Sequence, residues 1–241
     1  MGPGGGGLAV TRIPIIRDDL SRIRGRVSIE MGGEVVREMD NLYVNVGYQR
    51  LAQFLSGRAP AFPGFIALGN GDGSSGGAVV TPAAADQVMG FELLRRPIVS
   101  QGLIGLATVR YYVQFASTDV PRALTEVALF DSAGFNGQVT AATATTITDG
   151  TQNWTVNQWA GWTVYLALGT GSGQKAVINS NTATVLTVAT TLSPVPDTTT
   201  SYVLGGVGNN NYLYAHAPIS PTLTKALQPL NVIWQLALPQ N

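Results

Sequence analysis

The sequence predicts a mainly β fold: a β-sandwich or barrel-like core with one short helix, carrying an inserted small antiparallel β-barrel domain. Apolar residues alternate strictly at 109–116 and at 230–238, which is typical of strands with one buried face. The sequence also indicates an interrupted hairpin, because the return strand expected after the strand-like segment Thr125–Gly134 follows only at Asn210–Pro218. Residues 138–205, which separate the two, consist of short strand-like runs of a different character.

The interrupted hairpin sets the domain plan. We expect an extended N-terminal arm at 1–25, a discontinuous β-rich core domain at 26–137 plus 206–241, and an inserted small β domain at 138–205. Because 230–238 is the last strand of the chain, it completes the core only if the core closes around the insert. Insertion at a hairpin tip costs little, since loop-closure entropy grows only logarithmically with length. The insert should therefore project from the core as a knob.

The core begins with a predicted hairpin and a predicted helix. Arg26–Met31 and Glu34–Glu38 alternate on either side of a two-glycine turn, which is a hairpin signal. Apolar residues then recur at helical spacing over Asn45–Ser56. Asn45 is the candidate N-cap of this helix, and Gly57 lies just past its end. We expect a short helix packed on a sheet.

A strand at Phe65–Leu68 leads into the glycine-rich loop Gly69–Gly77. The loop lacks the Gly-Lys-Ser/Thr ending of a phosphate-binding loop and the closing glutamate of a calcium-binding loop. We therefore interpret it as a flexible connection, with a structural ion held by Asp72 as the alternative.

The insert is built from Thr- and Val-rich runs at Trp162–Leu166, Lys175–Ile178 and Ala183–Val188, separated by Gly, Ser and Asn. Strands that repeat at this spacing indicate a small antiparallel barrel or sandwich. The tryptophans Trp154, Trp159 and Trp162 allow two interpretations: a platform on which a sugar stacks, or the core of a small domain that is short of large aliphatic residues. We favour the core.

Composition excludes several kinds of site. The chain has 241 residues, of which 45% are hydrophobic, and no cysteine, so disulfides and thiolate metal sites are excluded. With a single histidine, imidazole clusters for metals are excluded as well. No apolar run approaches the length needed to span a bilayer, and the glycine-rich N-terminus lacks the apolar centre of a signal peptide. We expect a soluble protein that is used without export by the general secretory route.

Charge is unevenly distributed along the chain. Twelve of the fourteen basic residues precede position 123 and all twelve are arginine, while Lys175, Lys225, Asp149 and Asp197 are the only Lys, Arg, Asp or Glu residues after position 131. A surface with so few charges must be covered by Thr, Asn, Ser and Gln. Such neutral polar surfaces are common where proteins pack in arrays or face the outside of a particle.

The predicted arm combines arginines with isoleucines. Asp18 and Asp19 interrupt its basic run and the whole chain has a net charge of zero, so we do not expect nucleic-acid binding. Arginine forms bidentate pairs with carboxylates, which favours contacts with acidic surfaces of neighbouring subunits. The candidate partner-contact residues are Arg12, Arg17, Arg22 and Arg24.

His216 is the one candidate for acid–base chemistry by imidazole. A Ser-His-Asp arrangement would need a nucleophile beside it, and the chain contains no Gly-x-Ser-x-Gly elbow. We therefore predict a packed or interface histidine, no catalytic residue and no cofactor.

Several segments, in order, resemble small tail-associated proteins and fibre attachment domains of tailed bacteriophages. Within the insert, the resemblance is to a module found in phage tail and fibre proteins. Together these segments cover most of residues 26–238. In the core they are Asp40–Gly47, Ile66–Gly71, Leu124–Asp131 and Leu213–Ile219, and in the insert Thr148–Trp154, Gln158–Val164 and Gly169–Gln174.

The resemblance implies a structural, non-enzymatic virion protein, assembled in the cytoplasm of the host bacterium. We expect a baseplate or tail-fibre attachment subunit that docks on other virion proteins by its core and arm, forms a homo-oligomer such as a trimer, and projects the insert. One alternative is a head-surface or neck decoration protein. Another is a carbohydrate-binding protein that recognises a host surface glycan, or a glycan hydrolase, although no paired-carboxylate constellation is visible in the sequence.

Overall fold

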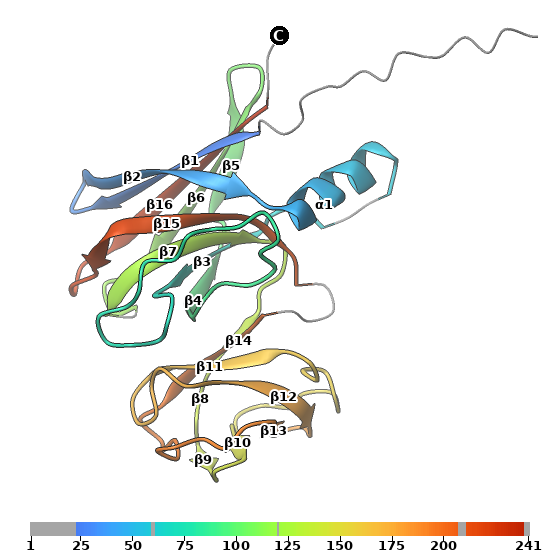
Figure 1. The fold of residues 1–241 in the computed structure, drawn as a ribbon, viewed down its shortest axis with the longest axis vertical. Helices are drawn as coiled ribbons and strands as arrows, with labels where there is room; N and C mark the ends of the chain where they lie inside the picture. Colours follow the sequence, from blue (N-terminus) through green and yellow to red (C-terminus); the bar gives the residue numbers. More distant parts are fainter. Residues whose placement is uncertain (1–22, 59–60, 120, 207–210, 239–241) are drawn as a thin grey trace, which may run out of the picture.

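A computed structural model describes residues 23–58, 61–119, 121–206 and 211–238, and it confirms the mainly β fold class. The described residues form two curled antiparallel sheets and one helix, α1 (Asn45–Leu55). Figure 1 shows the second sheet as a separate body at one end of the first. The nine-stranded sheet has the order β4 (Glu92–Pro97), β3 (Phe65–Gly69), β7 (Ala123–Phe130), β15 (Leu213–Thr224), β2 (Glu34–Tyr43), β1 (Arg24–Met31), β16 (Leu230–Ala237), β6 (Thr108–Phe115) and β5 (Ser100–Ile104). The seven-stranded sheet has the order β8 (Phe135–Gln138), β14 (Ser201–Gly205), β11 (Thr163–Leu168), β12 (Lys175–Asn181), β13 (Val185–Val188), β10 (Thr146–Thr148) and β9 (Ala141–Ala142).

The interrupted hairpin is present. β7 pairs with β15 in the first sheet, with Val127 opposite Ala217. The chain then passes into β8, which pairs with β14, the strand by which it returns, with Phe135 opposite Leu204. The strands that lead into and out of the second sheet are therefore neighbours. This sheet begins at Phe135, before the boundary expected at 138, because Phe135 pairs with β14 and packs against the second core.

The nine-stranded sheet curls around its main core, and a smaller apolar cluster that includes Ala128, Phe130 and Leu213 lies apart from that core. The two halves of the sheet meet at β15 and β2, where two residue pairs join them. The halves also approach at the other side, where Val99, between β4 and β5, donates its backbone N–H to the carbonyl of Tyr112 on β6. Trp234 of β16 and Phe115 of β6 are fully buried in the core that results.

Most of the predicted local elements form as expected. Gly32 and Gly33 link β1 to β2 with φ of 62° and 87°, the left-handed values that a two-residue hairpin turn requires. β16 alternates strictly between buried and half-exposed residues, as the period-two pattern predicts. In the second sheet, the three Thr- and Val-rich runs become β11, β12 and β13.

The predicted cap of α1 is wrong by one residue. Val44 occupies the N-cap, no side chain caps the helix, and Asn45 is the first helical residue. At the other end the helix stops as predicted, with Gly57 at φ 79°. Gly47 lets α1 approach β15, because a Cβ atom there would lie 2.5 Å from the carbonyl oxygen of Tyr214. The helix therefore packs on the sheet through its first turns.

The prediction of a flexible loop at Gly69–Gly77 is also wrong. Asn70 is fully buried, its amide donates to the carbonyl of Ser74 at 2.7 Å, and its Oδ1 accepts from the backbone N–H of Gly73 at 3.0 Å. A buried carboxylate, Glu126 on β7, accepts the backbone N–H of Gly71 at 2.9 Å. The side chains of Asn70 and Glu126, together with backbone hydrogen bonds such as that from Ala78 to Asn70, therefore hold the loop in one conformation.

Candidate partner-binding surface

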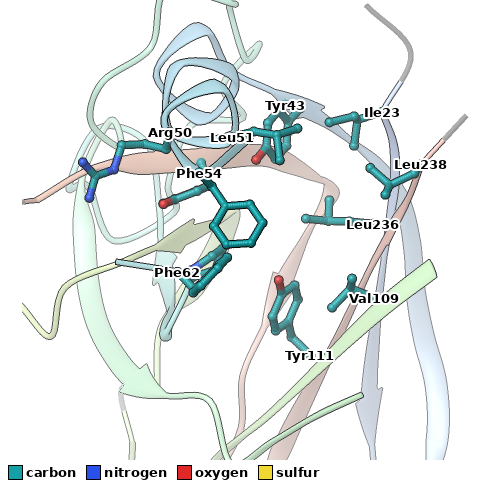
Figure 2. A pocket seen from close by; sticks show the side chains of 12 residues that line it. Ile23, Tyr43, Arg50, Leu51, Phe54, Phe62, Val109, Tyr111, Leu236 and Leu238 are labelled. Carbon is teal, nitrogen blue, oxygen red and sulfur yellow. The ribbon is translucent and has the colours of Figure 1, made fainter. Parts of the chain in front are cut away.

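An apolar cleft lies between α1 and the ends of β1, β16 and β6, and encloses about 160 Å³ (Figure 2). One wall is formed by residues at the start of β1, at the start of β6 and at the end of β16, and the opposite wall by α1 and the segment that follows it. The apolar side chains that line it include Ile23, Phe54, Phe62, Val109, Leu236 and Leu238.

The rim of the cleft on the α1 side is an exposed aromatic pair. The rings of Phe54 and Phe62 meet edge to face with centroids 4.9 Å apart, and the two residues are 46% and 58% exposed. Leu55, the last residue of α1, is exposed too. The helical spacing over Asn45–Ser56 predicted a helix packed on a sheet, and α1 does pack near its beginning, but Phe54 and Leu55 at its end are exposed to solvent.

Charge is kept out of the cleft. Burial raises the pKa of Tyr111 to about 12, so this phenol on the cleft wall stays neutral at physiological pH. The guanidinium of Arg50 points away from the cleft (Figure 2), where it pairs with Asp131 at 3.2 Å and lies 4.3 Å from the ring centroid of Tyr212. The arginine therefore contributes its aliphatic part to the cleft.

The apolar surface continues onto the edge of the nine-stranded sheet. Leu103 on β5 lies opposite Val109 on β6, which lies opposite Leu236 on β16. Residues directly opposite each other in an antiparallel sheet present their side chains on the same face. Leu103 therefore extends the surface formed by Val109 and Leu236, and it is 73% exposed. In the turn that follows, Leu106 is almost fully exposed.

Of the four predicted arm arginines, the structure places one. Arg24 is the first residue of β1 and is exposed, and Ile23 before it lines the cleft. Arg12, Arg17 and Arg22 lie outside the described residues.

The three tryptophans lie inside the second sheet. Trp154, Trp159 and Trp162 are each more than nine-tenths buried in its core. Trp159 packs edge to face on Trp162 with ring centroids 4.9 Å apart, and Phe135 joins the cluster beside Trp154. No face of these indoles lies open for a sugar to stack on.

His216 is packed, as predicted, but between two carboxylates that the sequence analysis missed. Its Nε2 lies 2.9 Å from Glu126 on β7, and its Nδ1 lies 3.0 Å from Asp86 in the segment before β4. Burial opposes protonation of the imidazole, but hydrogen bonds and charge from Glu126 and Asp86 outweigh it and raise the pKa of His216. Glu126 also accepts backbone N–H groups of Gly71, Gly90 and Phe91. The arrangement clamps three chain segments together.

A second buried network joins the two sheets. Arg95 on β4 forms a two-pronged pair with Glu92, with both donor–acceptor distances 2.8 Å, and both side chains are buried. Its remaining terminal nitrogen donates to the carbonyl of Ser132 and to Oδ1 of Asn211, and its guanidinium lies 3.6 Å from the ring centroid of Phe130. Ser132 and Asn211 belong to the two connections between the sheets, so one arginine holds both.

Two more cations reach across the junction. Arg122, just before β7, donates to the carbonyl of Ala167 on β11 at 2.5 Å. Lys175 on β12 donates to the carbonyl of Gly90 at 2.8 Å. Tyr165 of β11 and Val203 of β14 also belong to the core of the first sheet. The orientation of the second sheet is thus set by packing as well as by hydrogen bonds.

No helix in the described ranges is long and apolar enough to cross a membrane. Among the same residues, no group of three or more His, Asp or Glu side chains is placed to hold a metal ion. Comparisons with family models, with curated proteins and with solved structures gave no match.

Proposed function

We propose that the chain is a structural, non-enzymatic subunit of a tailed-phage virion, located in the baseplate or at the attachment point of a tail fibre. The observation that carries the proposal is the polarity of the molecule. The ends of β1 and β16 and the β5–β6 turn, with the apolar surface around them, lie on the side of the first sheet away from the second sheet (Figure 1). One end is suited to docking, and the other projects.

The junction supports this division of roles. A projecting unit keeps a fixed orientation only if its junction with the base is rigid. Here Arg95, Arg122 and Lys175 hold the second sheet through hydrogen bonds to several segments. Exposed apolar patches of this kind on a monomer mark sites of protein association. The order of phage-like segments in the sequence supplies the biological setting.

Immunogold electron microscopy of phage particles from the host that carries the gene tests the proposal. An antibody raised against residues 138–205 should label the tail tip. Label on the head or collar would instead favour a decoration protein, an alternative with which the N-terminal arm is also compatible. A chain that is absent from washed particles would overturn the virion role altogether.

Glycan binding is the alternative to a purely structural role, and experiment can distinguish the two. The buried tryptophans do not support it, because stacking needs an open indole face. Purified full-length chain should therefore give no signal on an array of bacterial surface glycans. Binding that survives Trp159→Phe but is lost on mutation of a surface residue would place a sugar site elsewhere and revive the receptor-recognition alternative.

A further inference from the structure

We propose that the apolar cleft is the seat of the N-terminal arm of a second copy of this chain, which inserts Ile13, Ile15, Ile16 and Leu20 between α1 and the ends of β1, β16 and β6. The inference rests on the proposed role as a subunit that assembles with copies of itself. It adds the site of that assembly, the segment that occupies it and the means by which copies are linked.

The chemistry of the two surfaces matches. The cleft is lined almost entirely by apolar groups, and the arm carries four large aliphatic residues within 13–20. A cavity of about 150 Å³ lined by Leu, Ile and Phe is known to hold a benzene-sized guest. The cleft has a similar volume of about 160 Å³, which suits one or two aliphatic side chains at a time.

The connection of the arm to the fold places it at the cleft. Ile23 forms part of the cleft wall, and β1 begins at the next residue. Residues 13–20 are therefore only a few positions from the cleft along the chain. An extended segment of eight residues spans about 26 Å, so the aliphatic part of the arm is long enough to lie along a cleft of a neighbouring copy.

The extent of the apolar surface favours a second copy over the same copy. Beyond the cleft, the surface includes the exposed side chains of Leu55, Leu103 and Leu106. An arm alone would leave these exposed, whereas the body of a second copy brought close by arm exchange would cover them.

Reciprocal exchange also gives a closed assembly. If each copy donates its arm to the next and receives one in return, a dimer or a ring satisfies every cleft. Each arm is tethered to its own fold, so contacts of the two bodies and the arms reinforce one another through effective concentration. Modest individual contacts then suffice for a stable oligomer.

The absence of cysteine from the natural chain makes a direct test available. Two full-length single variants are prepared, Ile16→Cys and Phe62→Cys, one of them with an added tag that changes its mass. They are mixed, allowed to exchange and oxidised. We expect a disulfide-linked heterodimer on a non-reducing gel. A matched control pairs Ile16→Cys with Val177→Cys, an exposed position on β12 of the second sheet, and should give little of the mixed product.

The double variant Ile16→Cys/Phe62→Cys separates the competing occupants. A fast-migrating monomer with an internal disulfide, and no heterodimer from the mixed singles, would overturn exchange in favour of an arm that folds back on its own copy. No specific product in either experiment would overturn the arm as occupant and leave the cleft to a different virion protein. These outcomes are independent of whether the chain is found in particles, which tests the proposed function.

A second measurement uses no engineered cysteine. Phe62→Ser changes an exposed residue, so the fold should persist with an unchanged far-ultraviolet circular dichroism spectrum. We expect the dissociation constant of the oligomer, from light scattering across a dilution series, to rise about tenfold or more. Deletion of residues 1–22 should weaken association at least as much. Val177→Ser is the control, and an oligomer that is equally stable in all four proteins would contradict the proposal.

Discussion

The two sheets of this protein differ in what they bury in their cores and in what they expose to solvent. The nine-stranded sheet buries charged side chains, Glu92 with Arg95 and Glu126 with His216, and leaves a continuous apolar surface exposed at its far end. The seven-stranded sheet packs its core with aromatic rings and anchors its turns with threonine hydroxyls and aspartates. Its exposed large apolar residues, among those described, are Val156, Val177 and Val195, which lie apart in the sequence.

The difference concerns what each sheet buries and what it leaves exposed. Buried charges hold distant segments in one geometry, but they do so at a cost in desolvation, so they specify shape more than they add stability. An exposed apolar surface is also stabilised only when something covers it. These features agree with the proposed function, in which the first sheet docks and the second sheet projects.

The largest expected effect follows from breaking the buried pair at the junction. Arg95→Met leaves Glu92 buried without its cation and removes the hydrogen bonds to Ser132 and Asn211. Loss of one partner of a buried pair costs about 3–5 kcal/mol. We expect the free energy of unfolding, from urea denaturation, to fall by this amount.

Arg26→Met is the matched control, since Arg26 pairs with Glu38 at 2.6 Å on the exposed face of the first sheet. An exposed pair contributes about 0–1 kcal/mol. Equal losses in the two variants would show that the junction arginine has no special role in holding the sheets together.

Truncation in the second core tests whether the sheets are energetically separate. Trp159→Ala removes a buried indole from the aromatic cluster, and such changes cost about 3–5 kcal/mol. Because Tyr165 and Val203 of the second sheet pack in the core of the first, we expect one calorimetric unfolding peak that moves to lower temperature and stays single. Trp234→Ala, in the first core, should move the same peak.

Two peaks, of which Trp159→Ala moves only one, would contradict this coupling. The second sheet would then be an independent domain joined by a weak interface. In that case the second sheet could be produced on its own, because it would fold independently of the first sheet.

Local patterns predicted much of this fold. The alternation of apolar residues at 230–238 predicted one strand, and the paired glycines Gly32-Gly33 predicted one turn. Both form as expected, because residues close together in the sequence determine them. The resemblance in sequence to phage proteins remains an expectation that sequence alone supplied. Strand β5 was not predicted, because all of its residues are exposed and it has no buried face to give a period-two signal.

The buried polar networks and the cleft could not be predicted in the same way. Glu126 stands in an otherwise apolar strand, a hint that it has a partner, but its contacts come from segments that are 36 and 90 residues away. The exposure of Phe54 and Phe62 depends on how α1 sits on β15, which Gly47 decides through a backbone approach. Helical spacing carries no information on that approach.

A glycine contact between the sheets gives a smaller and more local test. Gly73 and Gly173 touch across the junction, and a Cβ atom on Gly173 would lie 2.6 Å from the carbonyl oxygen of Gly73. Both residues also have positive φ. Gly173→Ala therefore adds an overpacking cost of about 1–3 kcal/mol to the strain of a left-handed alanine.

Gly161→Ala isolates the contact from the strain. Gly161 has a comparable φ of 82°, but a Cβ atom there would meet nothing within 4 Å. We expect Gly173→Ala to lower the free energy of unfolding more than Gly161→Ala does. If the two substitutions cost the same, the two loops are free to separate and their contact does not contribute to holding the junction.

The smallest expected effect is a pH dependence with opposite signs in the two sheets. In the first sheet, the pKa of His216 is raised by Glu126 and Asp86 against the effect of burial. A raised pKa in the folded state means that the contribution of His216 to stability is fully present below the unfolded pKa of about 6.5 and is lost as the pH rises through the folded pKa.

In the second sheet, hydrogen bonds from the hydroxyls of Thr199 and Thr170 lower the pKa of Asp197. Its contribution is present above the unfolded value of about 3.9 and is lost as the pH falls through the folded one.

Urea midpoints measured across pH separate the two effects. We expect the midpoint of the natural chain to fall as the pH rises from about 6.5 toward 9, and His216→Gln to flatten that limb while leaving the acid limb unchanged. Asp197→Asn should flatten the acid limb and leave the alkaline limb unchanged, because it alters a turn of the second sheet and leaves His216 in contact with both carboxylates. An alkaline limb that persists unchanged in His216→Gln would show that another group, and not deprotonation of the imidazole between Glu126 and Asp86, causes the loss of stability at high pH.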